Sequence, residues 1–246
     1  MDYSVLARSY NTLDYPEKLR NTLVAFYKDT SYSSYGKYDL HRKVNADLLK
    51  HYHGEEILKY RLANYFRSLN YTAAFEVKTT NCRADFLAIN GQTKCFEIKS
   101  KIDTLNRLEK QIYNYKELFE FNTIVIDEKH LESVKKLIPE YYGIWTFNGK
   151  KRYEHIKATI SPCLNPEKQI QILTKKELKK YFKQTYMPSI LYSFSNNEIN
   201  KLFKEALKAR YHVKWQFILN NWNSILPIDL QFFFNKNIVP DLIYSN

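Results

Sequence analysis

Two carboxylates and a lysine stand in one short stretch, RADFLAINGQTKCFEIKS, residues 83–100. The stretch reads as two strands around Asn90-Gly91, which is typical of a β-hairpin. Side chains alternate across a strand, so Glu97 and Lys99 share one face of the second strand. If the turn is a three-residue loop with Gly91 in the left-handed conformation, Asp85 lies opposite Glu97. The sequence therefore predicts two carboxylates and an ammonium on one patch.

Two carboxylates held this close repel each other unless a cation neutralises them. Oxygen ligands paired in this way suit a hard divalent cation, Mg²⁺ or Mn²⁺. Lys99 would then orient or deprotonate a metal-bound water and stabilise the negative charge that develops on a phosphate. Asp85 and Glu97 are thus predicted metal ligands, and the chemistry predicted for them is phosphodiester hydrolysis.

The pattern D-x(11)-E-x-K between two helices resembles the PD-(D/E)XK, or restriction-endonuclease-like, nuclease superfamily. Gln111 and Tyr115 match the QxxxY motif of its RecB-like branch. A glutamate often precedes the first strand in this superfamily, and of Glu55 and Glu56 we favour Glu56. The string EIKSKIDTLNRLEKQIYNY, followed by an apolar strand and GIW, is similar to an uncharacterised bacterial group of the superfamily. The resemblance spans about Gly54 to Phe147, and Ala84 stands where the superfamily has proline.

The resemblance implies a Mg²⁺-dependent nuclease, a hydrolase acting on nucleic acid, with DNA the expected substrate. Its site would contain the metal ligands Asp85, Glu97 and Glu56. Gln111 and Tyr115 would organise the site and the scissile strand. Glu76 either adds a ligand or lies on the rim. The alternative is a non-catalytic nucleic-acid-binding subunit that retains the nuclease fold, and the intact Asp, Glu and Lys set favours the enzyme.

Hydrophobic periodicity places these residues in an α/β fold, a restriction-endonuclease-like mixed sheet flanked by helices. We expect three regions: an N-terminal helical extension over 1–53, a nuclease-like core over 54–160, and a basic helical C-terminal region over 165–246, which we treat as a separate appendage. Helices are predicted over 16–28, 38–51, 55–69 and 130–138 and from 103, and strands over 73–78, 83–89, 94–99, 123–126 and 143–147.

The charge balance favours a polyanionic partner. Thirty-eight Lys and Arg residues oppose 26 Asp and Glu residues, for a net charge of +12. Nucleic acid is the first candidate, although an AT-rich genome also enriches a chain in lysine. Arg107 is a candidate phosphate contact and also a helical partner of Asp103, four residues earlier. The remaining nucleic-acid-binding candidates come from the C-terminal region: Lys204, Lys208, Arg210 and Lys214.

Composition excludes several other classes of protein. The three cysteines include no CxxC pair, and the five glycines form neither a P-loop nor a GxGxxG motif. No apolar run has the length of a membrane span, and the first ten residues do not resemble a signal peptide. We therefore expect a soluble cytoplasmic protein with no membrane partner. Sequence preference, strandedness and oligomeric state stay open.

Overall fold

One mixed sheet organises residues 1–245, the part of the chain that this computed structural model describes. In that range the sheet has six strands in the order β1-β2-β3-β4-β5-β6. The β1–β2, β2–β3 and β5–β6 pairs are antiparallel, whereas β3–β4 and β4–β5 are parallel. The predicted α/β class with a mixed sheet is confirmed. The strands are β1 Thr72–Lys78, β2 Arg83–Ile89, β3 Thr93–Lys99, β4 Phe121–Ile126, β5 Gly143–Asn148 and β6 Lys151–Ile156.

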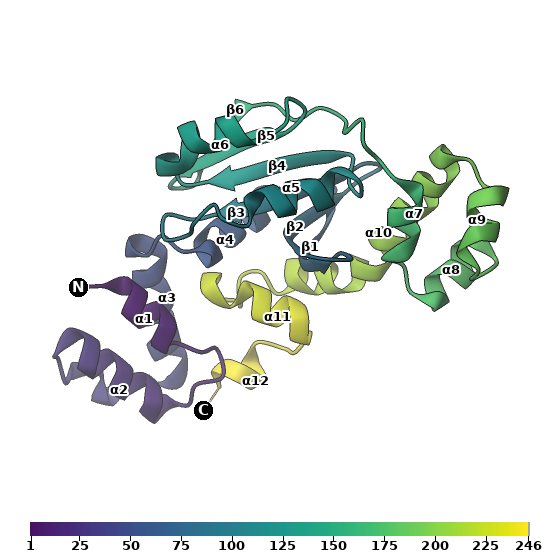
Figure 1. The fold of residues 1–246 in the computed structure, drawn as a ribbon. Coiled ribbons are helices and arrows are strands. Elements are labelled where there is room, and N and C mark those ends of the chain that lie inside the picture. Colours follow the sequence, from purple (N-terminus) through teal and green to yellow (C-terminus); the bar gives the residue numbers. More distant parts are fainter. Residues whose placement is uncertain (246) are drawn as a thin grey trace.

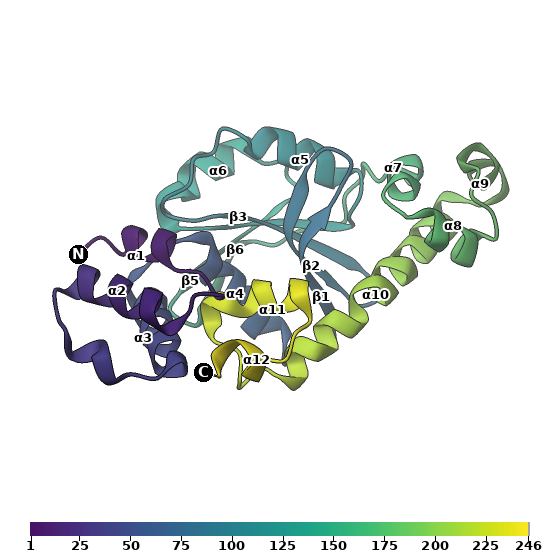
Figure 2. The ribbon, with the colours of Figure 1, turned by 90° about the horizontal axis from the view of Figure 1, so that it is seen from below.

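Helices cover both faces of the sheet. Figure 2 shows α5 and α6 over one face and α4, α10 and α11 over the other. The helices α1 to α3 lie at one end of the molecule, and α8 and α9 lie at the opposite end (Figures 1 and 2). The helices are α1 Tyr3–Ser9, α2 Pro16–Tyr27, α3 Lys37–His51, α4 Glu55–Phe66, α5 Leu108–Lys116, α6 Leu131–Leu137, α7 Pro166–Gln171, α8 Lys175–Phe182, α9 Met187–Ser193, α10 Asn196–Asn220, α11 Leu230–Lys236 and α12 Asp241–Tyr244, with short 3₁₀ turns at Ser31–Ser34, Glu128–His130 and Pro227–Asp229.

Strand alternation divides the sheet into an apolar face and a face that carries the polar groups. Phe96 packs against Phe66 of α4, with ring centroids 5.3 Å apart, and against Trp145 of β5 at 5.0 Å. Glu97 and Lys99 occupy the alternate positions of β3 and point to the α5 side. Their β4 neighbours in register, Ile124 and Ile126, belong to the core beneath α5 and α6.

The β2–β3 hairpin has the register that the sequence predicts. Ile89 pairs with Thr93, and Gly91 in the loop has φ 68°. A residue with a Cβ rarely adopts this left-handed conformation, which explains the glycine. On the other side of β2, Glu76 of β1 has φ 54°, and the regular strand pairs continue at Phe75 and Val77 on either side of it. The register is the same before and after Glu76, so Glu76 lies opposite Asp85 of β2.

The C-terminal helices share a hydrophobic core with the sheet. Buried Phe203 and Trp215 of α10 belong to the same cluster as Phe86 and Phe96, and α10 runs beside β1 (Figure 2). The expectation of a separate helical appendage is therefore wrong, because α10 needs the sheet to bury its apolar side. The region boundaries at residues 53 and 165 stay predictions.

A buried carboxylate joins the N-terminal helices to the C-terminal part of the chain. Asp229 is fully buried and accepts hydrogen bonds from the hydroxyls of Tyr10 (2.9 Å), Thr12 (2.7 Å) and Tyr244 (2.7 Å) and from the amide of Asn45 (3.3 Å). Burial raises the pKa of Asp229 although these donors lower it. These contacts fix α1 and α3 against the segment that precedes α11.

The described helices include no candidate membrane span. Within residues 1–245 no helix combines the length and apolar character that crossing a bilayer requires.

Candidate functional site

Three carboxylates from three elements converge at one edge of the sheet. Glu55 begins α4, Glu76 lies on β1 and Asp85 lies on β2, and their oxygen atoms lie within 4.8 Å of one another. They line a cleft of about 370 Å³. Like charges at this separation repel strongly away from bulk water, so a neighbouring cation or protonation of a carboxyl group stabilises the cluster.

Lys59 supplies one positive charge to this cluster. Its ammonium lies 2.5 Å from Glu55 Oε1, donates to Glu76, and donates to the Gln231 side chain at 2.7 Å. Burial alone would lower the pKa of Lys59, but Glu55, Asp85 and Glu76 raise it overall. The ammonium therefore stays charged at neutral pH and offsets part of the negative charge of the cluster.

Asp85 is the carboxylate of the cluster that has no close ammonium partner in the described chain. Its Oδ2 accepts a 2.6 Å hydrogen bond from the backbone N–H of Ile98. Burial raises the pKa of Asp85 well above its usual range, and the charges of Glu97 and Glu55 raise it further. The Lys59 charge opposes this rise in the pKa, although the two side chains form no ion pair.

Glu97 is neutralised separately. It is 1% exposed, lies 2.5 Å from the Lys99 ammonium, and accepts a 2.9 Å hydrogen bond from the Tyr115 hydroxyl, which also contacts the Arg83 carbonyl oxygen at 2.8 Å. Burial raises the pKa of Glu97, while Lys99 and Tyr115 oppose that shift. Lys99 and Tyr115 therefore hold Glu97 in a closed set of contacts, and Glu97 does not belong to the three-carboxylate cluster.

The structure does not bring Glu56 into the carboxylate cluster. Glu56 is solvent-exposed and lines a different, small hollow with Tyr60 and Pro227, so Glu55 occupies the place that we predicted for Glu56. The sequence signal that points to Glu55 as the member of the cluster is its i,i+4 spacing from Lys59, which places both on one side of α4. Glu76, whose position the sequence left open, does face the cluster.

The rim of the cleft is basic and polar. Arg83, Arg107, Lys110 and Asn81 line it together with Gln111. The Gln111 Oε1 atom is buried and has no hydrogen-bond partner within residues 1–245. The predicted pair between Arg107 and Asp103 does not form, because Asp103 instead accepts from the backbone and hydroxyl of Ser100. The cleft therefore has carboxylates at its floor and cationic side chains at its rim.

Three of the basic residues predicted to contact nucleic acid are engaged within the protein. Lys204 pairs with Glu120 at 2.8 Å and Arg210 pairs with Glu177 at 2.5 Å. Lys214 lies over the Phe234 ring. Lys208 is exposed on α10, and Arg107 is exposed at the rim. These internal contacts leave two of the five predicted groups directed to solvent.

A denser group of exposed lysines lies on α8. Leu178 and Phe182 are the buried residues of this helix. At about 100° per residue, its lysines lie roughly 60–200° around the helix axis from Leu178. All are exposed, and none forms an ion pair with another residue in the range 1–245. We call this group the lysine face: Lys175, Lys176, Lys179, Lys180 and the capping Lys183.

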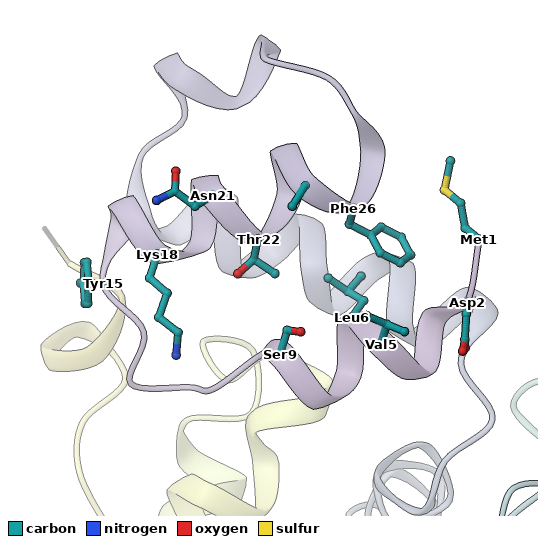
Figure 3. A pocket seen from close by; sticks show the side chains of 11 residues that line it. Met1, Asp2, Val5, Leu6, Ser9, Tyr15, Lys18, Asn21, Thr22 and Phe26 are labelled. Carbon is teal, nitrogen blue, oxygen red and sulfur yellow. The ribbon is translucent and has the colours of Figure 1, made fainter.

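A larger hollow on the N-terminal helices lacks such chemistry. It measures about 610 Å³ and lies between α1 and α2 (Figure 3). Val5, Leu6 and Phe26 give it an apolar lining, and the Lys18 ammonium beside it is bound to Asp14 at 2.6 Å. The convergent charged groups of the molecule lie in the carboxylate cleft instead.

These features define an α/β protein with a lysine-neutralised carboxylate cleft and a basic helical end. The family of bacteriophage P4 protein cII matches residues 49–233, and the chain belongs to this family. Protein cII of Enterobacteria phage P4 is 32% identical over 145 residues, which cover 53% of this chain and 55% of that protein. The chain thus spans about half the length of this curated relative. A solved protein of unknown function from Silicibacter pomeroyi aligns with a TM-score of 0.36 and 18% identity, covering 45% of this chain and 75% of that one.

The family match corrects the prediction of a PD-(D/E)XK nuclease. The matched family is that of phage P4 protein cII, and nothing in the comparisons indicates a hydrolase. The function, the enzyme class and the resemblance inferred from Asp85, Glu97 and Lys99 are therefore wrong. The physical argument for them assumed that Asp85 and Glu97 need a shared metal ion, whereas Lys99 already neutralises Glu97. The E-x-K spacing of Glu97 and Lys99 therefore forms a buried ion pair in this protein.

Proposed function

We propose that this protein binds nucleic acid, with DNA as the expected partner, and leaves it intact. The lysine face of α8 is the observation that supports this proposal most directly. Its five exposed ammonium groups have no carboxylate partners in the described chain, so they are available to replace the counterions of a phosphate backbone. The net charge of +12 acts in the same direction over longer distances.

The carboxylate cleft is proposed to bind Mg²⁺ as a structural or phosphate-bridging ion. Glu55, Glu76 and Asp85 provide oxygen ligands of the type that Mg²⁺ and Mn²⁺ prefer. The ammonium of Lys59 competes for two of these carboxylates. We therefore expect weak binding in the wild type, so that the site fills only at high Mg²⁺ concentration.

The proposed function is tested by measuring affinity for fluorescent DNA against salt concentration. Changing the five lysines of the face to glutamine should weaken binding for every sequence alike. It should also reduce the slope of log K against log salt by about 0.7–0.9 for each phosphate contact that is lost. The matched control makes the same change of charge at exposed lysines elsewhere: Lys28, Lys50, Lys136, Lys150 and Lys157.

Two results would contradict the proposal. Equal loss of affinity in both quintuple variants would mean that net charge, and not the lysine face, determines binding. Absence of binding at low salt would remove nucleic acid as a partner. Incubation with Mg²⁺ should return both circular and linear DNA at full length, and shortened products would contradict the non-hydrolytic reading.

A further inference from the structure

Two tyrosines are unusually exposed at the end of the molecule that carries the lysine face. Tyr186 immediately precedes α9 and is 69% exposed, and Tyr192 on α9 is 93% exposed. An aromatic ring usually contributes most when it is buried. These two rings therefore contribute little to the stability of the folded chain, and their exposure needs another explanation.

The packing of α9 shows that Tyr192 is not a displaced core residue. Ile190 is the buried residue of the helix, and Phe194 packs against Phe182 of α8 with ring centroids 5.3 Å apart. Tyr192 follows Ile190 by two positions, so it lies about 200° around the helix, on the opposite side. The core of this end is complete without either tyrosine.

The lysine face adjoins these rings in the chain. Lys183 ends α8 in a left-handed conformation, with φ 61°, and Tyr186 follows it by three residues, which limits the separation of the two backbones to about 10 Å. Measured along the axis of α9, Tyr186 and Tyr192 are offset by about 9 Å at ~1.5 Å per residue, and the same spacing turns them about 120° apart around the helix. This distance equals roughly two or three base steps of ~3.4 Å along one strand.

We propose that the α8–α9 end selects single-stranded nucleic acid, with Tyr186 and Tyr192 stacking on unpaired bases while the lysine face contacts the phosphates. This inference rests on the proposed function and specifies its substrate class. Exposed aromatic rings beside a positively charged track are the two elements of sequence-tolerant single-strand binding. The phosphates of a duplex can also bind the lysines. The bases of a duplex are stacked on one another, however, so their faces are not accessible to the tyrosine rings.

The chemistry separates this partner from other polyanions. An acidic protein segment or an anionic lipid surface would also attract the lysines, but neither presents a series of flat rings at regular spacing. Contributions from base stacking should therefore appear as a difference between polyanions that have the same charge and differ in whether bases are accessible.

The test compares Tyr186→Ala and Tyr192→Ala with the wild type on a labelled oligothymidine and on a duplex of equal length. Each change should weaken single-strand binding by about five- to 150-fold, the usual range for loss of one base stack. Duplex affinity and the salt slope should stay unchanged, because the lysines are untouched. Tyr186→Trp and Tyr192→Trp should restore single-strand binding. The control is Tyr153→Ala, which removes a tyrosine that is 38% exposed on β6.

The possible outcomes distinguish this inference from the proposed function. If the alanine variants lose no single-strand affinity, or lose duplex affinity equally, the stacking inference is refuted, and the effect of the lysine variants still decides nucleic-acid binding. If heparin or vesicles containing anionic lipid bind as tightly as oligothymidine and respond equally to both tyrosine changes, the surface serves another class of partner and the inference is again refuted. Circular dichroism of each variant verifies that α9 is retained.

Discussion

Replacing Lys59 by methionine is the sharpest perturbation of the carboxylate cleft. Methionine keeps most of the length of the side chain and removes the ammonium that contacts Glu55, Glu76 and Gln231. The Lys59 side chain is 7% exposed, whereas that of Glu55 is 37% exposed. The change therefore leaves three carboxylates within 4.8 Å of one another, with the exposed Arg83 guanidinium, 3.4 Å from Glu76, as the cation that still pairs with one of them.

The expected cost follows from the burial of the pair. Removing one partner of a buried ion pair costs about 3–5 kcal/mol, and the partial exposure of Glu55 places Lys59→Met near the lower end, at about 3 kcal/mol. This is a large fraction of the ~5–15 kcal/mol that stabilises a typical domain. Urea denaturation at pH 7 measures the loss directly as a change in the free energy of unfolding.

A divalent cation should reverse much of this loss. With Lys59 absent, Mg²⁺ no longer competes with an ammonium for the carboxylates. An ion whose concentration is one hundred times its dissociation constant adds about 2.7 kcal/mol to the free energy of unfolding. The control is Lys43→Met, which breaks the 2.7 Å pair with Asp47, where the lysine side chain is 33% exposed; we expect a loss of about 1 kcal/mol or less and no response to Mg²⁺. A Lys59→Met protein as stable as the wild type, or one that is destabilised and does not respond to Mg²⁺ or Mn²⁺, would refute the account of the cleft.

Two further predictions concern the buried acids. The pKa of Asp85 is raised by burial and by Glu97 and Glu55, so its ionisation reduces stability as the pH rises above the unfolded value of about 3.9. Asp85→Asn, which keeps an acceptor for the Ile98 N–H, should melt at a higher temperature than the wild type at pH 7 and at the same temperature near pH 3; a lower melting temperature at pH 7 would contradict this assignment. Asp229→Asn replaces one acceptor oxygen by a donor among several hydroxyls and should cost about 2–4 kcal/mol, since hydrogen bonds to a charged group contribute about 1.5–3 kcal/mol each. Limited proteolysis should then cut preferentially within residues 1–51, and a cleavage pattern equal to that of the wild type would show that the N-terminal helices are held by other contacts.

The sequence predicted the local features of the cleft better than the chemistry of the cleft. Asn90-Gly91 specified the hairpin, and the observed pairing of Ile89 with Thr93 follows from the short loop that Gly91 permits. Strand alternation then determined the side of the sheet on which Glu97 lies. These inferences succeeded because they depend on residues that are close in the chain.

The missing information was non-local. The cluster brings Glu55 of α4 together with Glu76 and Asp85 of two strands, and no local pattern predicts the pairing of β1 with β2 or the position of α4. The sequence also did not reveal that Lys59 and Lys99 neutralise the carboxylates, because their partners depend on how α4 and α5 pack on the sheet. In the same way, α10 reads as a basic surface helix until its apolar side is placed on β1.

The buried contacts of Asp229 have a consequence for the time course of folding. Thr12 and Asp229 are separated by 217 positions in the chain. A ribosome that adds about 5–20 residues per second therefore synthesises Asp229 roughly 10–45 s after Thr12. During that interval α1 to α3 can form and pack on one another, since they have a small apolar cluster of their own. They cannot dock until Asp229 leaves the ribosome. The order of synthesis therefore makes attachment of the first helices one of the last steps of folding, and a nascent chain stalled before residue 229 should leave Tyr10 and Asn45 accessible to solvent.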